Sequence, residues 1–115
     1  MSPVLVFSTI LCVICISLGQ LLFKKAALAL PSPLSLAALL LNGWLISALI
    51  LYGVTTIGWI LILRHAPLHL AYPFMSLAFL IVPILGWLFL GEPMHWQTLA
   101  GGSLIMAGVV LASAK

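Results

Sequence analysis

The sequence predicts an all-α protein, an integral membrane bundle of four helices that run alternately up and down. Five of the 115 residues are Lys, Arg, Asp or Glu, or 4%, whereas an ordinary soluble domain carries about 25%. Apolar residues make up 65% of the chain, and they fall into stretches of about the 20 residues that a helix needs to cross a bilayer. A chain so poor in charge cannot build a water-soluble exterior, so lipid is its expected solvent.

The net charge of +3 does not indicate a nucleic-acid partner. Four Lys and Arg residues scattered among aliphatic ones form no basic face. Cutting the chain at its charged and turn-forming residues predicts a single four-span domain over residues 1–115, with spans at about 3–23, 42–63, 70–90 and 96–114.

The first span is expected to end at Lys24 and Lys25. No basic stretch precedes its apolar run and no small-residue cleavage site follows, which favours a retained helix over a signal peptide. The next stretch, ALALPSPLS, contains Pro31 and Pro33 at a spacing that interrupts a helix, so we expect a connection there. Residues 34–41 either begin the second span or lie at the membrane interface.

The two remaining connections are short. Arg64 and Pro67 mark the one after the second span, and Gly91, Glu92 and Pro93 mark the one before the fourth. Because short connections place successive helices side by side in opposite directions, the sequence predicts an up-down bundle without a soluble domain.

The Lys and Arg residues do not select an orientation in the membrane. Arg64 and Lys115 fall on the side of the termini, and Lys24 and Lys25 fall on the opposite side. Orientation follows the Lys and Arg bias between the two sides, and here the two sides are equal. We therefore expect either insertion in both directions with antiparallel pairing, or a partner protein that fixes the direction.

The fourth span carries small residues that permit close helix packing. Gly101 and Gly108 are seven residues apart, hence on one face, and Ala112 extends that face by another turn. In lipid, helices associate through such small residues because no hydrophobic driving force acts between them. The sequence predicts a helix contact at this face, either within one chain or between two chains.

A stripe of small side chains also follows the first span. Ser8, Cys12, Cys15 and Gly19 recur at helical spacing and are expected to pack against other helices. The two cysteines lack a second Cys or His pair that would indicate zinc. Gln20 lies beside the stripe, and an amide without a partner in hydrocarbon costs several kcal/mol. We expect it to form an interhelical hydrogen bond or to face a wet cavity.

Two prolines lie in the third predicted span. Pro73 falls in the first turn, where its missing N–H is harmless. Pro83 is interior and removes one backbone hydrogen bond, which membrane helices tolerate when neighbours satisfy the freed carbonyl. Pro83 therefore indicates either a fixed bend or a hinge.

Polar and aromatic residues recur along the same span. Tyr72, Ser76 and Phe79 are one helical turn apart in succession, and with Gln20 they could form a strip that faces a central cavity. Tyr72 equally fits an interfacial anchor of the aromatic belt.

The sparse charges exclude some functions. Glu92 is the sole carboxylate, and its place in a loop disfavours proton coupling through an acid buried in a span. Lys24, Lys25 and Arg64 could hold a phosphate at the membrane surface, or they could only anchor the span ends. No nucleophile with a base, metal cluster or Gly-rich phosphate loop is visible, so neither an enzyme nor a cofactor is expected.

Three stretches carry a resemblance to a known family: GQLLFKKA (19–26), HAPLHLAYPFMSLAF (65–79) and LGEPMHWQTLAGGSLIMAGVVL (90–111). The chain resembles the small multidrug resistance group of the drug/metabolite transporter superfamily over its whole length. It is most similar to the paired inner-membrane subunits that flip aminoarabinose-phosphoundecaprenol, the ArnE and ArnF type. The drug-exporting relatives place an essential glutamate in the first span, where this chain has Ile16. The resemblance therefore implies the lipid-carrier branch, with dimerisation through the fourth span.

The leading hypothesis is a bacterial inner-membrane transporter of an undecaprenyl-phosphate-linked sugar or a similar anionic lipid. The headgroup is expected in a groove between spans one and three, near Gln20, Tyr72 and Ser76, with the phosphate at one of the three cations named above and a bend at Pro83. The expected protein partner is a second copy or a related four-span subunit. Two alternatives are an exporter of cations or metabolites and a structural subunit of a larger complex.

Overall fold

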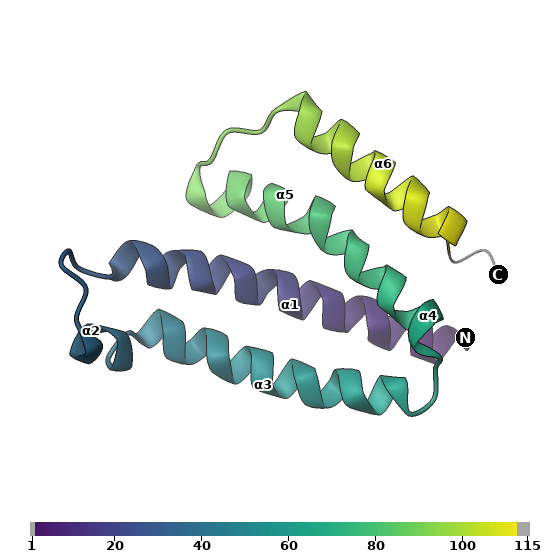
Figure 1. Ribbon diagram of the computed structural model, residues 1–115, viewed down its shortest axis with the longest axis horizontal. Coiled ribbons are helices and arrows are strands. Elements are labelled where there is room, and N and C mark those ends of the chain that lie inside the picture. Colours follow the sequence, from purple (N-terminus) through teal and green to yellow (C-terminus); the bar gives the residue numbers. More distant parts are fainter. Residues whose placement is uncertain (1, 113–115) are drawn as a thin grey trace.

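The computed structural model describes residues 2–112, and these residues form helices and connections without a strand (Figure 1). The elements are α1 (Pro3–Ala29), α2 (Leu36–Leu40), α3 (Gly43–Leu63), α4 (Leu68–Ala71), the 3₁₀ segment η1 (Tyr72–Leu77), α5 (Ala78–Leu90) and α6 (Trp96–Ala112). The predicted all-α class is confirmed. Residues 113–114 of the predicted fourth span, and Lys115, lie outside the described residues.

Three helical segments of the described chain are long and apolar enough to cross a membrane. They are α1, α3 and the continuous run Leu68–Leu90. The fourth apolar helix, α6, has 17 described residues, about 25 Å at 1.5 Å per residue. These helices make the chain a multi-pass membrane protein.

The first span is longer than predicted. Lys24 and Lys25 do not end α1, which continues to Ala29, because Lys and Ala are both strong helix formers. The helix ends at Leu30, which is extended with φ −75° and ψ 139°. Leu30 precedes Pro31, and the ring of a proline disfavours helical backbone in the residue before it.

The second span begins where the sequence predicts. Asn42 caps α3, and its Oδ1 accepts a hydrogen bond from the backbone N–H of Leu45 at 3.2 Å. The same side chain donates through Nδ2 to the carbonyl of Ala26 at 2.9 Å, which ties the end of α1 to the start of α3. Residues 34–41 do not begin this span, because they contain the separate short helix α2 and a turn.

The third span is not one regular helix. It starts as α4, tightens into η1 at Tyr72 and becomes α5 at Ala78. Pro83 lies inside α5 and has no N–H to donate to the carbonyl of Phe79, four residues before it. That carbonyl faces α6, since a Cβ placed on Gly102 would lie 3.5 Å from the Phe79 oxygen.

The four long helices lie side by side in the order α3, α1, α5, α6, and along the chain each reverses the direction of the one before it (Figure 1). The helix pairs in contact are α1 with α3, α1 with α5, and α6 with α5 and η1. The two outer helices, α3 and α6, make no extensive contact with each other, so the described helices form one open layer and not a closed bundle (Figure 1). One chain therefore leaves both faces of the layer uncovered.

Small side chains let α1 approach α3 closely, as the stripe on the first span predicts. A Cβ on Gly19 would lie 2.6 Å from Cε1 of Tyr52, and a Cβ on Gly58 would lie 3.5 Å from Sγ of Cys12. Ser8 lines a hollow together with Gly58. The stripe thus faces α3 at Ser8, Cys12 and Gly19.

The contact of α6 within the chain uses neither of the two glycines predicted for it, Gly101 and Gly108. Gly102 is buried, and a Cβ there would lie 2.5 Å from Cδ2 of Leu80. A Cβ on Gly101 or Gly108 would meet no described atom within 4 Å outside its own helix, and Ala112 is exposed. Adjacent residues point about 100° apart on a helix, so the face of Gly101 and Gly108 turns away from the chain. Their predicted contact within one chain is therefore not formed, and a contact between chains stays a prediction.

Candidate functional site

A seam between α1 and α5 forms the candidate site. Two adjoining cavities lie along it, one of about 240 Å3 at the loop end and one of about 430 Å3 deeper in the span. The first is lined by Gln20, Leu21, Lys24, Val82, Gly86, Leu90 and Glu92. The second is lined by Ile16, Gln20, Ala78, Phe79, Val82 and Pro83. Gln20 and Val82 line both cavities, so the two cavities adjoin along the seam.

Helical spacing builds this seam from each side. Ile16, Gln20 and Lys24 are four residues apart on α1, so they lie in a row along one face. Val82 and Gly86 form the matching row on α5. The seam is charged at Lys24 and apolar at Ile16. The sequence placed a groove between spans one and three near Gln20, Tyr72 and Ser76, and of these three residues Gln20 lines the seam.

The charged end is built by the loop after α5. Gly91 adopts left-handed backbone with φ 68°, which glycine accommodates readily, and this turns the chain back on α5. The N–H of Glu92 donates to the carbonyl of Gly86 at 3.2 Å. A Cβ added to Gly86 would lie 2.5 Å from Oε1 of Glu92, which is closer than real Cβ atoms approach. The absence of a side chain at Gly86 therefore makes room for the carboxylate beside the helix.

Lys24 and Glu92 form an ion pair across the mouth of this cavity. Nζ of Lys24 lies 3.9 Å from Oε2 of Glu92, and the two side chains are 48% and 50% exposed. Pairs this exposed contribute about 0 to 1 kcal/mol to stability. The sequence analysis assigned Glu92 to a loop only. Its being the only acidic residue of the sequence was the available signal, and nothing in the sequence indicated Lys24 as its partner.

Gln20 both lines the cavities and makes the interhelical hydrogen bond that was one of its two predicted roles. Its Nε2 donates to the hydroxyl of Tyr52 on α3. The Tyr52 ring packs edge-on against Phe23, with centroids 5.2 Å apart and planes at 60°. Sequence reasoning missed Tyr52, which lies in a span where nothing in the local pattern points to Gln20.

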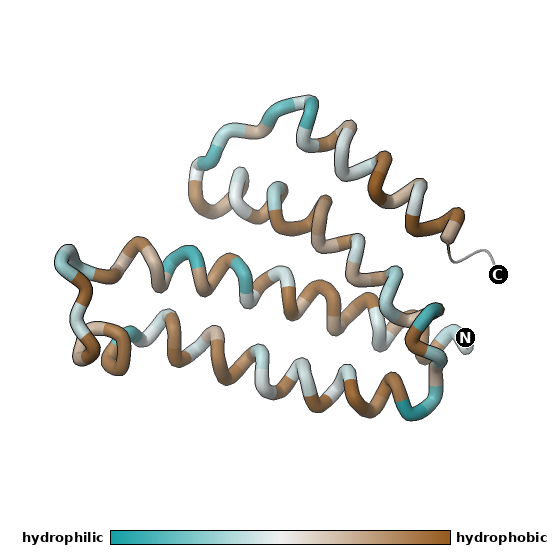
Figure 2. The backbone as a smooth tube through the Cα atoms, in the orientation of Figure 1, coloured by the Kyte–Doolittle hydropathy of each residue, from teal (hydrophilic) through white to brown (hydrophobic). Residues whose placement is uncertain are grey.

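The three predicted phosphate-binding cations do not meet. The ammonium of Lys25 lies 4.9 Å from the ring centroid of Trp44, a cation-π contact that ties α1 to the start of α3. Arg64 caps the C-terminal end of α3, which lies about 30 Å from the start of that helix at 1.5 Å per residue. Only Lys24 lines the seam. Figure 2 shows the hydrophilic stretches gathered in the connections between helices and toward the end of α1 that faces α2.

The predicted strip of Tyr72, Ser76 and Phe79 is also divided. Phe79 lines the deeper cavity beside Gln20. Ser76 is 6% exposed and donates to the carbonyl of Pro73 at 2.7 Å and to Sδ of Met106 on α6 at 3.1 Å. Tyr72 is 63% exposed. In a 3₁₀ helix of 3.0 residues per turn, residues 72 and 76 point about 120° apart, so η1 separates residues that an α-helix would align.

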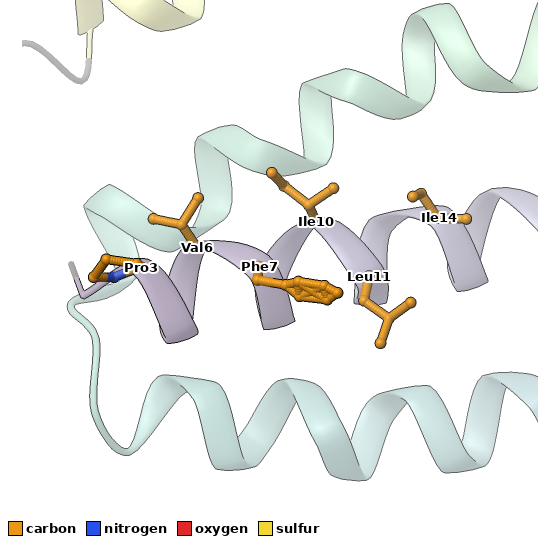
Figure 3. Close-up of a pocket in the computed structure, with 6 residues that line it drawn as sticks. All are labelled: Pro3, Val6, Phe7, Ile10, Leu11 and Ile14. Atoms are coloured by element: carbon orange, nitrogen blue, oxygen red, sulfur yellow. The ribbon is translucent and has the colours of Figure 1, made fainter.

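Two larger hollows lack comparable chemistry. Figure 3 shows one of about 500 Å3, whose six labelled residues all belong to α1 and are all apolar. Another of about 550 Å3 lies between η1 and α6, where Ser76 is the only polar lining residue. Within residues 2–112 no three His, Cys, Asp or Glu residues gather as a metal site would require. A hollow between α1 and α3 is lined by Ser8, Cys12 and His65. The seam differs from these hollows in that Lys24 and Glu92 line it together.

Comparison with known proteins gives similar chains over most of their lengths. A probable 4-amino-4-deoxy-L-arabinose-phosphoundecaprenol flippase subunit ArnE of Pectobacterium atrosepticum is 37% identical over 99 residues, which cover 83% of this chain and 85% of the relative. ArnE of Serratia proteamaculans is 38% identical, with 83% of each chain covered. A probable subunit ArnF of the same flippase, from Erwinia tasmaniensis, is 36% identical with 86% of each chain covered. No family model and no solved structure matches the chain.

Proposed function

This chain belongs to the family of the 4-amino-4-deoxy-L-arabinose-phosphoundecaprenol flippase subunits, and on that premise we propose that it moves an undecaprenyl-phosphate-linked sugar, such as aminoarabinose, across the bacterial inner membrane. It acts as a transporter subunit and not as an enzyme. The observation that carries this proposal is the seam between α1 and α5, which changes from charged to apolar along its length.

The seam matches the two parts of a lipid-linked phosphate. Lys24 supplies a positive charge at the loop end, where an anionic headgroup lies in contact with water. Ile16 and Phe79 line the deeper part, where a polyprenyl chain is soluble. Gln20 stands between them with an amide that can bond a phosphate or sugar oxygen. The seam thus offers a charged environment for the headgroup and an apolar environment for the polyprenyl chain.

Pro83 supports a mechanism for opening the seam. It lines the deeper cavity, and the carbonyl of Phe79 that it leaves free faces α6 at Gly102. The α5 backbone therefore lacks one hydrogen bond at the level of the ligand path, which lowers the cost of bending there. In this proposal α5 bends at Pro83 to expose the seam alternately to the two membrane surfaces.

A second four-span chain completes the transporter. The single layer of helices leaves both of its faces open, and Gly101 and Gly108 on α6 have room for a closely packed partner. Ala112 continues this surface. We propose that a second copy or a related subunit packs here and closes the bundle. The similarity to both ArnE and ArnF fits either partner.

The test compares Lys24→Ala with the matched variant Arg64→Ala, since both remove one cation but only Lys24 lines the seam. Binding of polyprenyl phosphate is measured by native mass spectrometry. A hydrogen bond to a charged group contributes about 1.5–3 kcal/mol, so Lys24→Ala is expected to weaken binding by about tenfold or more, and Arg64→Ala to leave it unchanged. Equal binding by both variants and the unmodified chain would refute the phosphate site.

Transport itself is measured as headgroup translocation in liposomes that contain this chain, with sugar-linked and bare polyprenyl phosphate compared. The same liposomes with a related subunit added distinguish a self-sufficient chain from one that needs a partner. Proton release on adding a quaternary ammonium compound, without lipid translocation, would instead support a cation exporter.

A further inference from the structure

We propose that Glu92 selects the headgroup by binding a cationic amine on the sugar, while Lys24 binds the phosphate. Glu92 is the only carboxylate in the chain, and its side chain lies in the wall of the cavity at the loop end of the seam. This inference rests on the proposed function, because it assumes a lipid-linked phosphate in that cavity. It assigns to Glu92 the discrimination between aminosugars and neutral sugars.

The charge pattern of the cavity carries the inference. A site for a ligand that bears only negative charge would be weakened by a carboxylate 3.9 Å from its single cation. A ligand with one negative and one positive group instead finds a partner of opposite sign for each. A neutral sugar on the same phosphate leaves Glu92 without a partner once Lys24 turns to the phosphate. The cavity therefore favours zwitterionic headgroups and disfavours purely anionic ones.

The ion pair can be exchanged for the ligand at small cost. Without a ligand, Lys24 and Glu92 neutralise each other, and half of each side chain is exposed. Pairs in such settings are weak. A zwitterionic headgroup replaces this one pair by two and leaves no charge bare. Lys24 and Glu92 thus pair with each other when the cavity is empty, and each pairs with a ligand group of opposite charge when it is occupied.

The fold fixes the backbone from which the carboxylate extends toward the cavity. The left-handed turn at Gly91 and the hydrogen bond from Glu92 N–H to the Gly86 carbonyl direct the side chain back along α5. Gly86 leaves the space that Oε1 occupies. The cavity of about 240 Å3 has room for about eight water molecules at roughly 30 Å3 each, close to the size of one sugar ring.

The experiment measures binding of three lipids by native mass spectrometry: polyprenyl phosphate linked to an aminopentose, the same lipid with its amine acetylated, and bare polyprenyl phosphate. The unmodified chain is compared with Glu92→Gln, which removes the charge and keeps the shape. Arg64→Ala serves as a charge change outside the seam. The unmodified chain and Arg64→Ala are expected to prefer the aminopentose lipid over the acetylated one by about tenfold, the effect of one charge-assisted hydrogen bond. Glu92→Gln is expected to bring this ratio close to one, with binding of the acetylated lipid retained.

A second variant keeps the test decisive if Glu92→Gln does not fold. Gly86→Ala places a Cβ 2.5 Å from the position of Oε1 and so displaces the carboxylate without removing its charge. It is expected to lower the preference for the aminopentose lipid. An unchanged preference in these variants, or equal binding of the two sugar lipids by the unmodified chain, would overturn the assignment of Glu92 while leaving the lipid-phosphate site intact. Failure of the unmodified chain to bind any of the three lipids would overturn the proposed function and this inference together.

Discussion

Replacement of Gly19 by Ala is expected to destabilise the protein, although alanine is the better helix former. A Cβ on residue 19 would lie 2.6 Å from Cε1 and 2.7 Å from Cδ1 of Tyr52. Ordinary contact begins at 3.4 Å, so the ring or the helix must retreat by about 0.8 Å. The ring has no easy path, because its edge packs against Phe23 and its hydroxyl accepts the hydrogen bond from Gln20.

The magnitude follows from two opposing terms. Overpacking a close contact costs about 1–3 kcal/mol, and replacing Gly by Ala inside a helix stabilises it by up to about 1 kcal/mol. Because an approach of 2.6 Å lies far inside ordinary contact, the upper part of that cost applies, about 2–3 kcal/mol. After the gain from alanine, the net loss is expected to be about 1–2 kcal/mol, a factor of about 5–30 in the ratio of folded to unfolded protein.

The assay is unfolding of the purified protein in mixed micelles with increasing dodecyl sulfate, followed by circular dichroism. Gly53→Ala is the matched control, because a Cβ there would meet no described atom within 4 Å, and it is expected to cause no loss. In a Tyr52→Ala background the ring is absent, so Gly19→Ala should become neutral or stabilising. If Gly19→Ala destabilises equally with and without the Tyr52 ring, the close contact between α1 and α3 is not the cause and the reasoning fails.

Four further substitutions test Asn42 and the two faces of α6. Asn42→Ala removes both the α3 cap and the bond to the Ala26 carbonyl, and it is expected to cost about 1–2 kcal/mol in the same unfolding assay. Asn42→Ser retains a capping oxygen and should recover part of this loss; no difference between the two variants would argue against the cap. Gly108→Leu is expected to weaken association of chains in detergent, measured by crosslinking, while the unfolding of the single chain stays unchanged, because a Cβ at that position would meet no described atom within 4 Å outside its own helix. Gly102→Leu should do the reverse and destabilise the chain itself, since Gly102 packs against Leu80; equal effects of the two substitutions on both measurements would contradict the assignment of the two faces of α6.

The seam shows how far sequence patterns could locate the site. Gln20 was predicted to bond across helices or to face a cavity, and it does both, because an amide in hydrocarbon must find a partner wherever the fold offers one. Tyr72 and Ser76 were predicted to join it on the assumption of a regular α-helix. The 3₁₀ segment η1 rotates them apart, and the sequence shows only Pro73 as a sign of irregular backbone.

The ion pair of Lys24 and Glu92 could not be predicted from the sequence. Lys24 lies on α1 and Glu92 in the loop after α5, and the two side chains meet only because α5 packs on the side of α1 opposite to α3. No local sequence pattern indicates the order of the helices in the layer. The loop position of Glu92, correctly identified, therefore gave no indication that its carboxylate would reach a cavity wall.

The sequence by itself determined that the chain is helical, that it crosses a membrane and approximately where its spans begin and end. These features depend on runs of apolar residues matched to the thickness of a bilayer, and on prolines and caps that act within a few residues. The tertiary structure alone decided the rotation and the neighbours of each helix, including the burial of Gly102 in place of Gly101. Helices that are apolar on every side carry no periodic signal for the face they bury, so close packing of small residues, which depends on the whole fold, makes that choice.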